Sequence, residues 1–255
     1  MQLSKNALGQ IAAQPRLEIP SAKLLGLPEK VLQFGTGVLL RGLPDYFIDK
    51  ANKQGIFNGR VVIVKSTDSD SSAFDKQDGL YTICVRGVEN GKTIEENIIN
   101  ASVSRVLSAN TEWKRILECA HNLEMKIILS NTTEVGIQLT DDNINDEPPS
   151  SFPGKLLAFL QERFKAFNGS AESGMVIVPT ELITDNGSKL ESIVLELAHL
   201  NNLDFKFIEW LETNNIFCNS LVDRIVPGKP NAEELKRTEE TLGYTDELLT
   251  NSEVF

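Results

Sequence analysis

The sequence has few of the residues from which metal and disulfide sites are built. Its cysteines, Cys84, Cys119 and Cys218, lie far apart without a CxxC pair, and the chain of 255 residues has 2 histidines. A disulfide framework and a zinc site are therefore not expected, and we interpret the cysteines as core residues or free thiols. His121 and His199 fall late in amphipathic segments, where we expect exposed residues near helix ends and neither a metal site nor a Ser-His triad.

Long apolar runs and an excess of positive charge are missing as well. No segment approaches the roughly 18 uninterrupted apolar residues of a membrane span, and residues 1–14 lack the compact apolar run of a signal peptide. Lys+Arg 25 against Asp+Glu 36 gives a formal net charge of -11, spread along the chain, which argues against binding along nucleic-acid phosphates. We therefore expect a cytoplasmic protein whose partners include neither a membrane nor a nucleic acid.

The chain does contain short β-branched runs that alternate with longer segments of helical spacing. Such strands, nearly continuous in apolarity and separated by helices, predict a parallel sheet covered on both faces. The expected fold is α/β, a doubly wound, Rossmann-like, mostly parallel sheet. The runs expected as strands are 31–34, 61–68, 126–130 and 174–179, and the longest expected helices are 38–54, 111–123 and 152–167.

Two features interrupt this alternation. The segment Glu89-Asn90-Gly91-Lys92 separates two β-rich runs, and Asn-Gly is typical of the tight turn that closes an antiparallel hairpin. We therefore predict one hairpin inserted into the α/β pattern. The polar, proline-containing stretch DDNINDEPPSS (141–151) is the only strong candidate for a linker.

The stretch VLQFGTGVLLRG (31–42) predicts a binding loop after the first strand. Gly35 and Gly37 occupy the first two positions of a GxGxxG pattern, although Leu40 occupies the third. In a doubly wound sheet, a glycine-rich first turn lets a pyrophosphate approach the backbone at a helix N-terminus. We therefore assign Gly35, Thr36, Gly37 and Val38 to a dinucleotide cofactor, with an ordinary turn as the alternative.

The second expected strand ends in Asp68, which is a candidate for the adenosine half of the cofactor. Its carboxylate could bind the ribose hydroxyls and would repel a ribose phosphate, which favours NAD over NADP. Lys65 and Arg60 lie nearby and weaken this preference. The alternative is an aspartate that only caps a turn at the strand end.

The segment SNTTEVGI (130–137) continues from the end of the expected strand over 126–130. Residues at that place in a dinucleotide fold meet the nicotinamide ribose, so we assign Asn131 and Thr132 to the cofactor. Glu134 fits a site residue and a helix-start charge equally well.

Six segments together resemble a known family. They are QFGTGVLLRG, QDGLYTICVRG (77–87), SNTTEVGI, FPGK (152–155), VPTELITDNG (178–187) and NSLVDRIVPG (219–228). Nearly the whole chain resembles the N-terminal part of the mannitol dehydrogenase family of long-chain, metal-independent polyol and uronate dehydrogenases, whose first turn also lacks the third glycine. The resemblance implies NAD-dependent hydride transfer on a small sugar acid, the interconversion of D-tagaturonate and D-altronate.

Four residues are candidates for the substrate site. The family's polyol dehydrogenases place an oxyanion-binding asparagine where this chain has Leu182, which leaves Glu181 and Asn186 as candidates. Asp223 and Arg224 follow an apolar strand, and Arg224 could pair bidentately with a uronate carboxylate. The alternatives are a simple turn at Asn186 and a loop-pinning Asp-Arg ion pair.

The resemblance also implies a division into domains. We expect a Rossmann-like NAD-binding domain over 1–235 and the start of a helical substrate domain over 236–255. The family's catalytic lysine, with asparagine and histidine support, belongs to that helical domain, so we expect it beyond Phe255, in a protein nearly twice as long. The readings left open are another dehydrogenase of the same family, of fructuronate or mannitol type, and a non-catalytic nucleotide-binding module.

Overall fold

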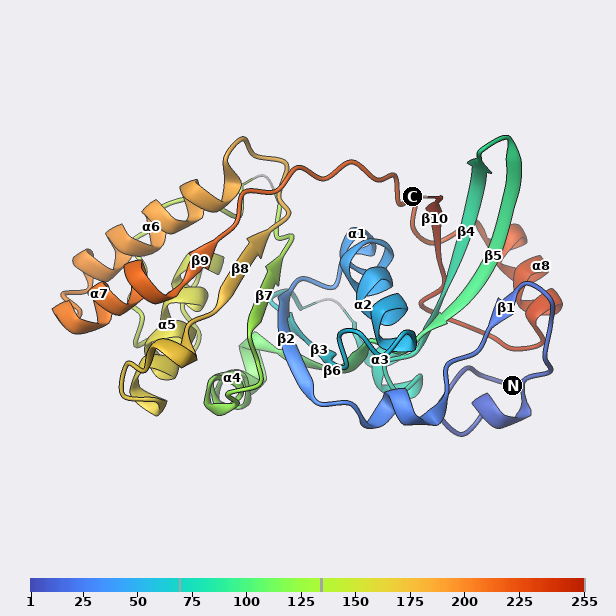
Figure 1. The fold of residues 1–255 in the computed structure, drawn as a ribbon, viewed down its shortest axis with the longest axis horizontal. Helices are drawn as coiled ribbons and strands as arrows, with labels where there is room; N and C mark the ends of the chain where they lie inside the picture. The colour runs from blue at the N-terminus through green and yellow to red at the C-terminus, as the bar shows by residue number, and fades with distance from the viewer. Residues whose placement is uncertain (69, 134, 255) are drawn as a thin grey trace.

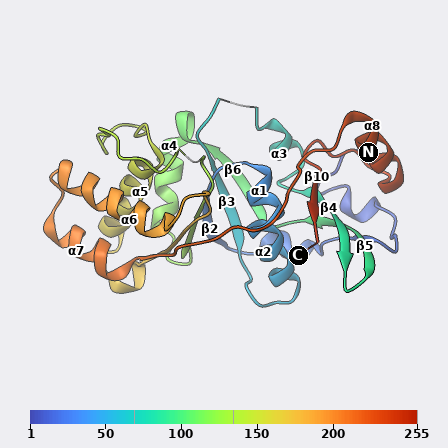
Figure 2. The same ribbon diagram turned by 90° about the horizontal axis from the view of Figure 1, so that it is seen from above.

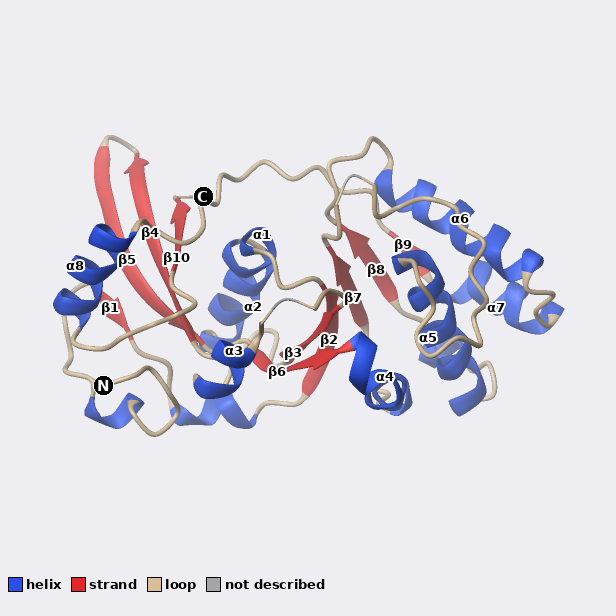
Figure 3. Ribbon diagram, turned by 180° about the vertical axis from the view of Figure 1, so that it is seen from behind, coloured by secondary structure: helices blue, strands red, loops and turns tan. Residues whose placement is uncertain are grey.

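The structure is a computed structural model that describes residues 1–68, 70–133 and 135–254. Two β-sheets lie side by side in an elongated molecule (Figures 1 and 3). Helices α5 (Phe152–Ala166), α6 (Asn186–Leu200) and α7 (Phe205–Asn214) lie at one end, and helix α8 (Ala232–Leu242) lies at the other. The first sheet has six strands and the second has four in the described part of the chain.

The larger sheet is entirely parallel and has the order β6-β3-β2-β7-β8-β9. Counted along the chain, its strands are arranged 3-2-1-4-5-6, the Rossmann order, and the direction of winding reverses between β2 and β7. The parallel α/β prediction is therefore confirmed. The strands are β2 (Glu29–Phe34), β3 (Arg60–Lys65), β6 (Val103–Ser108), β7 (Ile127–Ser130), β8 (Val176–Pro179) and β9 (Ile216–Phe217).

Helices and a second layer cover the two faces of this sheet, because alternate strand residues point to opposite sides. Val62 and Val64 belong to the core beneath α4, α5, α6 and α7. Val61 and Ile63 belong to a separate core with α2, α3 and the second sheet. The helices are α1 (Val38–Gly42), α2 (Pro44–Lys53), α3 (Ser72–Lys76), α4 (Ala109–Glu118), α5 (Phe152–Ala166), α6 (Asn186–Leu200), α7 (Phe205–Asn214) and α8 (Ala232–Leu242), with short 3-10 segments at Leu8–Gln10, Ala22–Gly26, Cys119–His121 and Ala171–Ser173.

The expected helix over 38–54 is split in two. Leu43 has non-helical angles of φ -119 and ψ -84, and Pro44 starts α2. Proline disfavours the helical region for the residue before it, which accounts for the break. Helix α1 is therefore a separate short helix that directly follows the glycine loop.

The predicted hairpin is confirmed, and it belongs to a second sheet that the sequence did not predict. Strands β4 (Tyr81–Glu89) and β5 (Lys92–Asn100) pair antiparallel, and the turn residues Asn90 and Gly91 both have positive φ. Short strands from the two ends of the chain extend this hairpin in parallel: β1 (Leu17–Glu18) pairs with β5, and β10 (Thr250–Glu253) pairs with β4.

The N-terminal segment and α8 cover the outer face of this second sheet. Leu3, Leu17 and Leu242 share a core with Cys84 and Ile99 of the hairpin. The backbone of Leu3 also donates a hydrogen bond to the carbonyl of Thr245 (2.9 Å). Residues 236–254 thus help to complete the second sheet and the core on its outer face. The expected domain division after residue 235 stays a prediction.

The stretch 141–151 is a folded loop, so its interpretation as a linker is wrong. Asp142 accepts hydrogen bonds from the backbone nitrogen (2.9 Å) and hydroxyl (2.5 Å) of Ser150, and Ile144 is buried in the main core. Ser151 then caps α5 by accepting a hydrogen bond from the nitrogen of Gly154 (3.0 Å). The polar residues that indicated a linker make the hydrogen bonds that fix this loop.

The three cysteines are free, with Cys84 and Cys119 buried, as predicted. Both histidines are exposed, and His121 lies 2.7 Å from a carboxylate oxygen of Glu162. Within the described ranges, no helix is long and apolar enough to span a bilayer, and no group of three or more histidine, cysteine or acidic side chains could hold a metal ion.

Candidate dinucleotide-binding site

The candidate cofactor residues gather where the winding of the parallel sheet reverses. The backbone of Gly35, directly after β2, donates to the carbonyl of Val64 on β3 (3.0 Å), and Asn131, directly after β7, donates to the carbonyl of Phe34 (3.1 Å). The glycine loop and the Asn131 segment therefore lie side by side at the carboxyl edge of the sheet. In open α/β sheets, ligands bind in the crevice at this switch point.

The two glycines of the loop serve different purposes. Gly35 has φ +125, and a Cβ atom there would lie 2.9 Å from the carbonyl oxygen of Asn131, so only glycine fits. Gly37 is exposed and precedes α1, and a Cβ atom there would meet nothing within 4 Å. Gly35 is needed for the close approach of two strand ends, whereas Gly37 leaves open space beside the backbone. Thr36 and Val38 flank Gly37 and are half-buried.

Asp68 lies just beyond β3, next in the sheet to β2, and its side chain is exposed. The side-chain amide of Asn110 donates a hydrogen bond to its carboxylate (2.8 Å). Asn110 is in the first turn of α4, which follows the neighbouring strand β6. The carboxylate is thereby held at the carboxyl edge of the sheet, on the β3 side of the glycine loop.

Asn131 and Thr132 are tied to the end of strand β8. The side-chain amide of Asn131 donates to the carbonyl of Thr180 (2.9 Å), while the backbone nitrogen and hydroxyl of Thr132 both donate to Glu181 (2.9 Å each). The hydroxyl of Ser130 donates to the other carboxylate oxygen of Glu181 (3.1 Å). The buried Glu181 therefore fixes the segment after β7. Glu134 lies outside the described residues.

Asn186 is fully buried and connects two loops. Its side-chain amide donates to the carbonyls of Pro179 (3.1 Å) and Glu181 (3.0 Å), and its side-chain oxygen accepts from the backbone nitrogen of Ser220 (2.9 Å). Beside these loops is a pocket of about 500 Å³, formed by residues 181–185 and 219–222. Leu182 and Leu221 line it and remain 65% and 93% exposed, so the pocket has an apolar rim.

The structure places Asp223 and Arg224 in different surroundings. Asp223 is exposed, whereas Arg224 is buried and its guanidinium lies 4.5 Å from the ring centre of Tyr46. Arg224 donates to the carbonyls of Gly42 at the end of α1 (2.7 Å) and Glu253 in β10 (2.8 Å). Burial lowers its pKa from the ordinary arginine value. The guanidinium thus joins α1, the helix that follows the glycine loop, to the second sheet.

A buried polar group behind the glycine loop was missed at the sequence level. Gln33, within β2, donates to the carbonyl of Gly35 (3.3 Å) and to Asp45 (3.4 Å), and the hydroxyl of Tyr81 also donates to Asp45 (3.3 Å). Burial raises the pKa of Asp45 to about 7. The guanidinium of Arg41 lies 5.5 Å from the Tyr81 ring centre. The one available signal was Gln33 itself, a polar residue inside an apolar strand.

Two curated altronate oxidoreductases are similar to this chain in sequence. The chain is 42% identical over 230 residues to an altronate oxidoreductase of Bacillus subtilis (strain 168), and 39% identical over 256 residues to that of Halalkalibacterium halodurans. These alignments cover 89% and 99% of this chain but 48% and 49% of the relatives. The chain thus spans about half the length of the curated relatives it matches.

Two solved structures share the fold. A mannitol 2-dehydrogenase of Pseudomonas fluorescens, in a ternary complex with NAD and D-mannitol, superposes with a TM-score of 0.85 at 21% identity over 100% of this chain and 53% of its own. A substrate-free D-sorbitol dehydrogenase gives 0.83 at 22% identity, covering 100% and 54%. The family model that describes the mannitol dehydrogenase Rossmann domain matches residues 29–255 of the sequence. The chain therefore belongs to the mannitol dehydrogenase family.

Proposed function

We propose that this chain is the dinucleotide-binding part of an NAD-dependent oxidoreductase that interconverts D-tagaturonate and D-altronate by hydride transfer. The observation that carries the proposal is the open glycine loop at the switch point of a Rossmann sheet, in a chain 42% identical to an altronate oxidoreductase. The mannitol 2-dehydrogenase of the same fold is a complex with NAD and D-mannitol, which supports a nicotinamide cofactor.

The residues at the switch point of the sheet fit NAD. The space beside Gly37 would accept a pyrophosphate close to the backbone, with Thr36 and Val38 on either side. The Asp68 carboxylate, held by Asn110, would accept hydrogen bonds from ribose hydroxyls and repel a ribose phosphate. Asn131 and Thr132 would contact the nicotinamide half at the neighbouring strand end. When bound, the cofactor accepts the hydride in its oxidised form, NAD, and donates it in its reduced form, NADH.

The substrate would enter beside the nicotinamide half, in the pocket beyond β8. In this proposal Glu181 and Asn186 act as positioning residues, because their hydrogen bonds hold the segment after β7 and the segments that form the pocket. The exposed Asp223 follows the pocket segment directly and is placed to face a polar substrate. Arg224 would act by holding α1, which the glycine loop precedes.

Proton transfer requires a group that we do not assign within residues 1–255. The relatives are about twice as long as this chain, and we propose that a further domain of the same protein supplies the catalytic lysine. A second candidate function is a polyol dehydrogenase of the same family, which the fold shared with mannitol and sorbitol dehydrogenases favours.

Cofactor binding can be tested with a matched pair of glycine variants and a fluorescence titration with NADH and NADPH. The chain should bind NADH saturably and NADPH more weakly. Gly37→Ala should keep the melting temperature, because the new methyl group meets nothing, yet weaken NADH binding about tenfold by filling the pyrophosphate space. Gly35→Ala should instead lower the melting temperature, because its Cβ atom strikes Asn131. Unchanged NADH binding by folded Gly37→Ala would contradict the assignment of the loop.

The reaction itself is tested with the longer protein that contains this chain. NADH oxidation should be fastest with D-tagaturonate, compared with D-fructuronate and D-fructose. A preference for fructose would favour the polyol dehydrogenase. Binding of NADH without turnover of any of the three substrates would leave only a nucleotide-binding module.

A further inference from the structure

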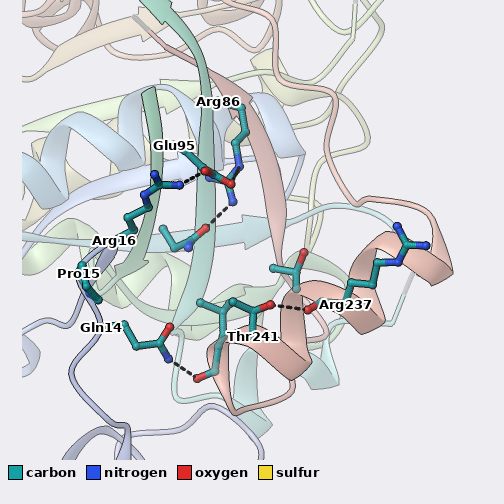
Figure 4. A pocket seen from close by; sticks show the side chains of 10 residues that line it. Gln14, Pro15, Arg16, Arg86, Glu95, Arg237 and Thr241 are labelled. Atoms are coloured by element: carbon teal, nitrogen blue, oxygen red, sulfur yellow. Dashed lines mark hydrogen bonds and ion pairs between the residues drawn. The ribbon is translucent and has the colours of Figure 1, made fainter. Parts of the chain in front are cut away.

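A second pocket lies in the other half of the molecule, between the β4-β5 hairpin and α8 (Figure 4). Its volume is about 370 Å³, within the usual size range of small-molecule sites. It shares no lining residue with the glycine loop, with the Asn131 segment or with the pocket beyond β8. Three arginines and one glutamate supply its charges: Arg16, Arg86, Arg237 and Glu95.

Arg86 is fixed in place by the sheet that carries it. Its Nη1 donates to the carbonyls of Val85 (2.9 Å) and Glu96 (2.7 Å), and its Nη2 donates to the side-chain oxygen of Asn97 (2.7 Å). Its Nε lies 3.9 Å from Glu95, too far for a hydrogen bond. An anion in the place of Glu95 would face Nε of a guanidinium that is already held in position, and a planar guanidinium suits two oxygens of one anion.

Glu95 lies between two of the arginines and shows that this place suits an anion. One of its oxygens pairs with Arg16 and the other faces Arg86. In Figure 4 the two guanidinium groups converge on this carboxylate from opposite sides. The side chain of Arg16 is 66% exposed, so it can turn from Glu95 to a ligand at little cost, because exposed ion pairs contribute little to stability.

The opposite wall, formed by α8, offers hydrogen-bond acceptors and a small apolar surface. The hydroxyls of Thr238 and Thr241 donate to the carbonyls of Glu234 and Arg237 (2.9 Å each), so towards the pocket their oxygens can only accept. Acceptors of this kind suit the hydroxyl groups of a ligand. Leu242 adds an apolar contact between this wall and the N-terminal segment.

We propose that this pocket binds a small hydroxylated organic anion, a sugar phosphate or a sugar acid, separately from the dinucleotide site. The anionic group would bind to Arg86 and Arg16, and the hydroxyls would donate to Thr238 and Thr241. Arg237 is paired with Glu233, so the attraction for an anion comes from Arg86 and Arg16 and is local to this pocket, in a chain of formal net charge -11.

Isothermal titration calorimetry of the 255-residue chain tests the proposal, with glucose 6-phosphate, gluconate and inorganic phosphate as probes at matched ionic strength. One of the two organic anions should bind saturably and more tightly than inorganic phosphate, and the stronger of them identifies the anionic group. Arg86→Gln and Arg16→Gln should each weaken binding about tenfold by removing a charge-assisted contact. Glu95→Gln should strengthen binding several-fold, because it removes the carboxylate that competes with the ligand.

Arg115→Gln is the matched control, because Arg115 is an exposed arginine on α4, outside the pocket. It should leave the affinity unchanged, and circular dichroism should give the same spectrum for every variant. If Arg86→Gln does not fold, Arg16→Gln and Glu95→Gln decide alone, since both side chains are partly exposed. Absence of saturable binding by the folded chain, or equal weakening by Arg115→Gln, would overturn the proposal.

Discussion

Asp45 is fully buried beneath the glycine loop, where its carboxyl group has little solvation. One of its oxygens accepts from Gln33 and Tyr81, while the other has no hydrogen-bond partner in the described part of the chain. Burial raises its pKa to about 7, although the two hydrogen bonds and the charge of Arg41 oppose the shift. The folded protein therefore keeps this proton over a range of pH in which the unfolded chain has lost it.

The charge of Asp45 should make the protein less stable as the pH rises. Between pH 4 and 7 the folded state binds more protons than the unfolded state, so the free energy of unfolding should fall, by about 4 kcal/mol at most for this group. Asp45→Asn should reduce that fall when urea unfolding is measured at pH 5 and pH 8. The pKa values of Asp49 and Asp246 are also raised, so part of the fall should remain.

Asp75→Asn is the control for this measurement, because Asp75 is exposed on α3. In this variant the free energy of unfolding should differ between pH 5 and pH 8 by as much as in the unaltered chain. If the free energy of unfolding of Asp45→Asn fell between pH 5 and pH 8 by as much as that of the unaltered chain, Asp45 would already be ionised in the folded state.

Single residues were harder to predict than the loops that contain them. Asn186 and Arg224 were interpreted as candidates for substrate contact because they are polar and follow strands. In the structure their polar atoms bind main-chain groups of segments distant in sequence, namely Ser220 for Asn186 and Glu253 for Arg224. A sequence gives the residue type and the strand end, but it does not give the direction in which a polar side chain points.

At the scale of elements, the loop before α5 shows how polar residues can specify a fixed conformation. Burial opposes ionisation of Asp142, but hydrogen bonds from Ser150, Ser151 and Thr140 outweigh it and lower the pKa of this carboxyl to about 2. The carboxylate also lies against Gly154, in the first turn of α5. The loop and the helix start are therefore held by one ionised group.

Loss of that carboxylate should loosen the loop and the first turn of α5. Asp142→Asn should lower the free energy of unfolding at pH 6 by about 2 kcal/mol, because an amide cannot accept all of these hydrogen bonds. In the unaltered chain the same stabilisation should be present above about pH 4 and disappear as the pH falls towards 2. Thermal unfolding at pH 6 and pH 3 would measure both effects, and the exposed neighbour variant Asp141→Asn should change neither.

The parallel strands and the hairpin were predictable because each carries a local signal. The runs at 31–34, 61–65 and 127–130 are nearly continuous in apolarity, and the hairpin has its Asn-Gly turn. Strands β1 and β10 have two and four residues, too few to show a period, and their partners lie far away in sequence. The second sheet could therefore not be predicted from local patterns.

For the whole molecule, the connection between its two halves is the main structural feature. After β9 the chain runs across the top of the molecule towards β10, as the views from the front and from above both show (Figures 1 and 2). Arg224 lies on this crossing segment and holds the carbonyls of Gly42 and Glu253 together. The position of α1, directly after the glycine loop, thereby depends on the second sheet.

Arg224→Ala should therefore weaken both regions that the guanidinium joins. We expect a loss of about 2–4 kcal/mol in the free energy of unfolding, because carbonyls lose a charged donor and Tyr46 loses its stacked partner. Hydrogen exchange should become faster in both β10 and α1. Asp223→Ala, at the exposed neighbouring position, should change stability by less than about 0.5 kcal/mol. Faster exchange in β10 alone would show that the second sheet does not support the glycine-loop helix.

The pairing of the two chain ends has a consequence for folding during synthesis. Strands β2, β3 and β6 come from residues 29–108, so half of the parallel sheet can form early on the ribosome. The hairpin is made in the same interval, but its neighbours β10 and Thr245 are translated only after the last strand of the parallel sheet, β9. Until they emerge, one edge of β4 and part of the outer hairpin face stay uncovered, and unpaired edges promote aggregation. The nascent chain should therefore need chaperone protection at β4 until β10 has emerged.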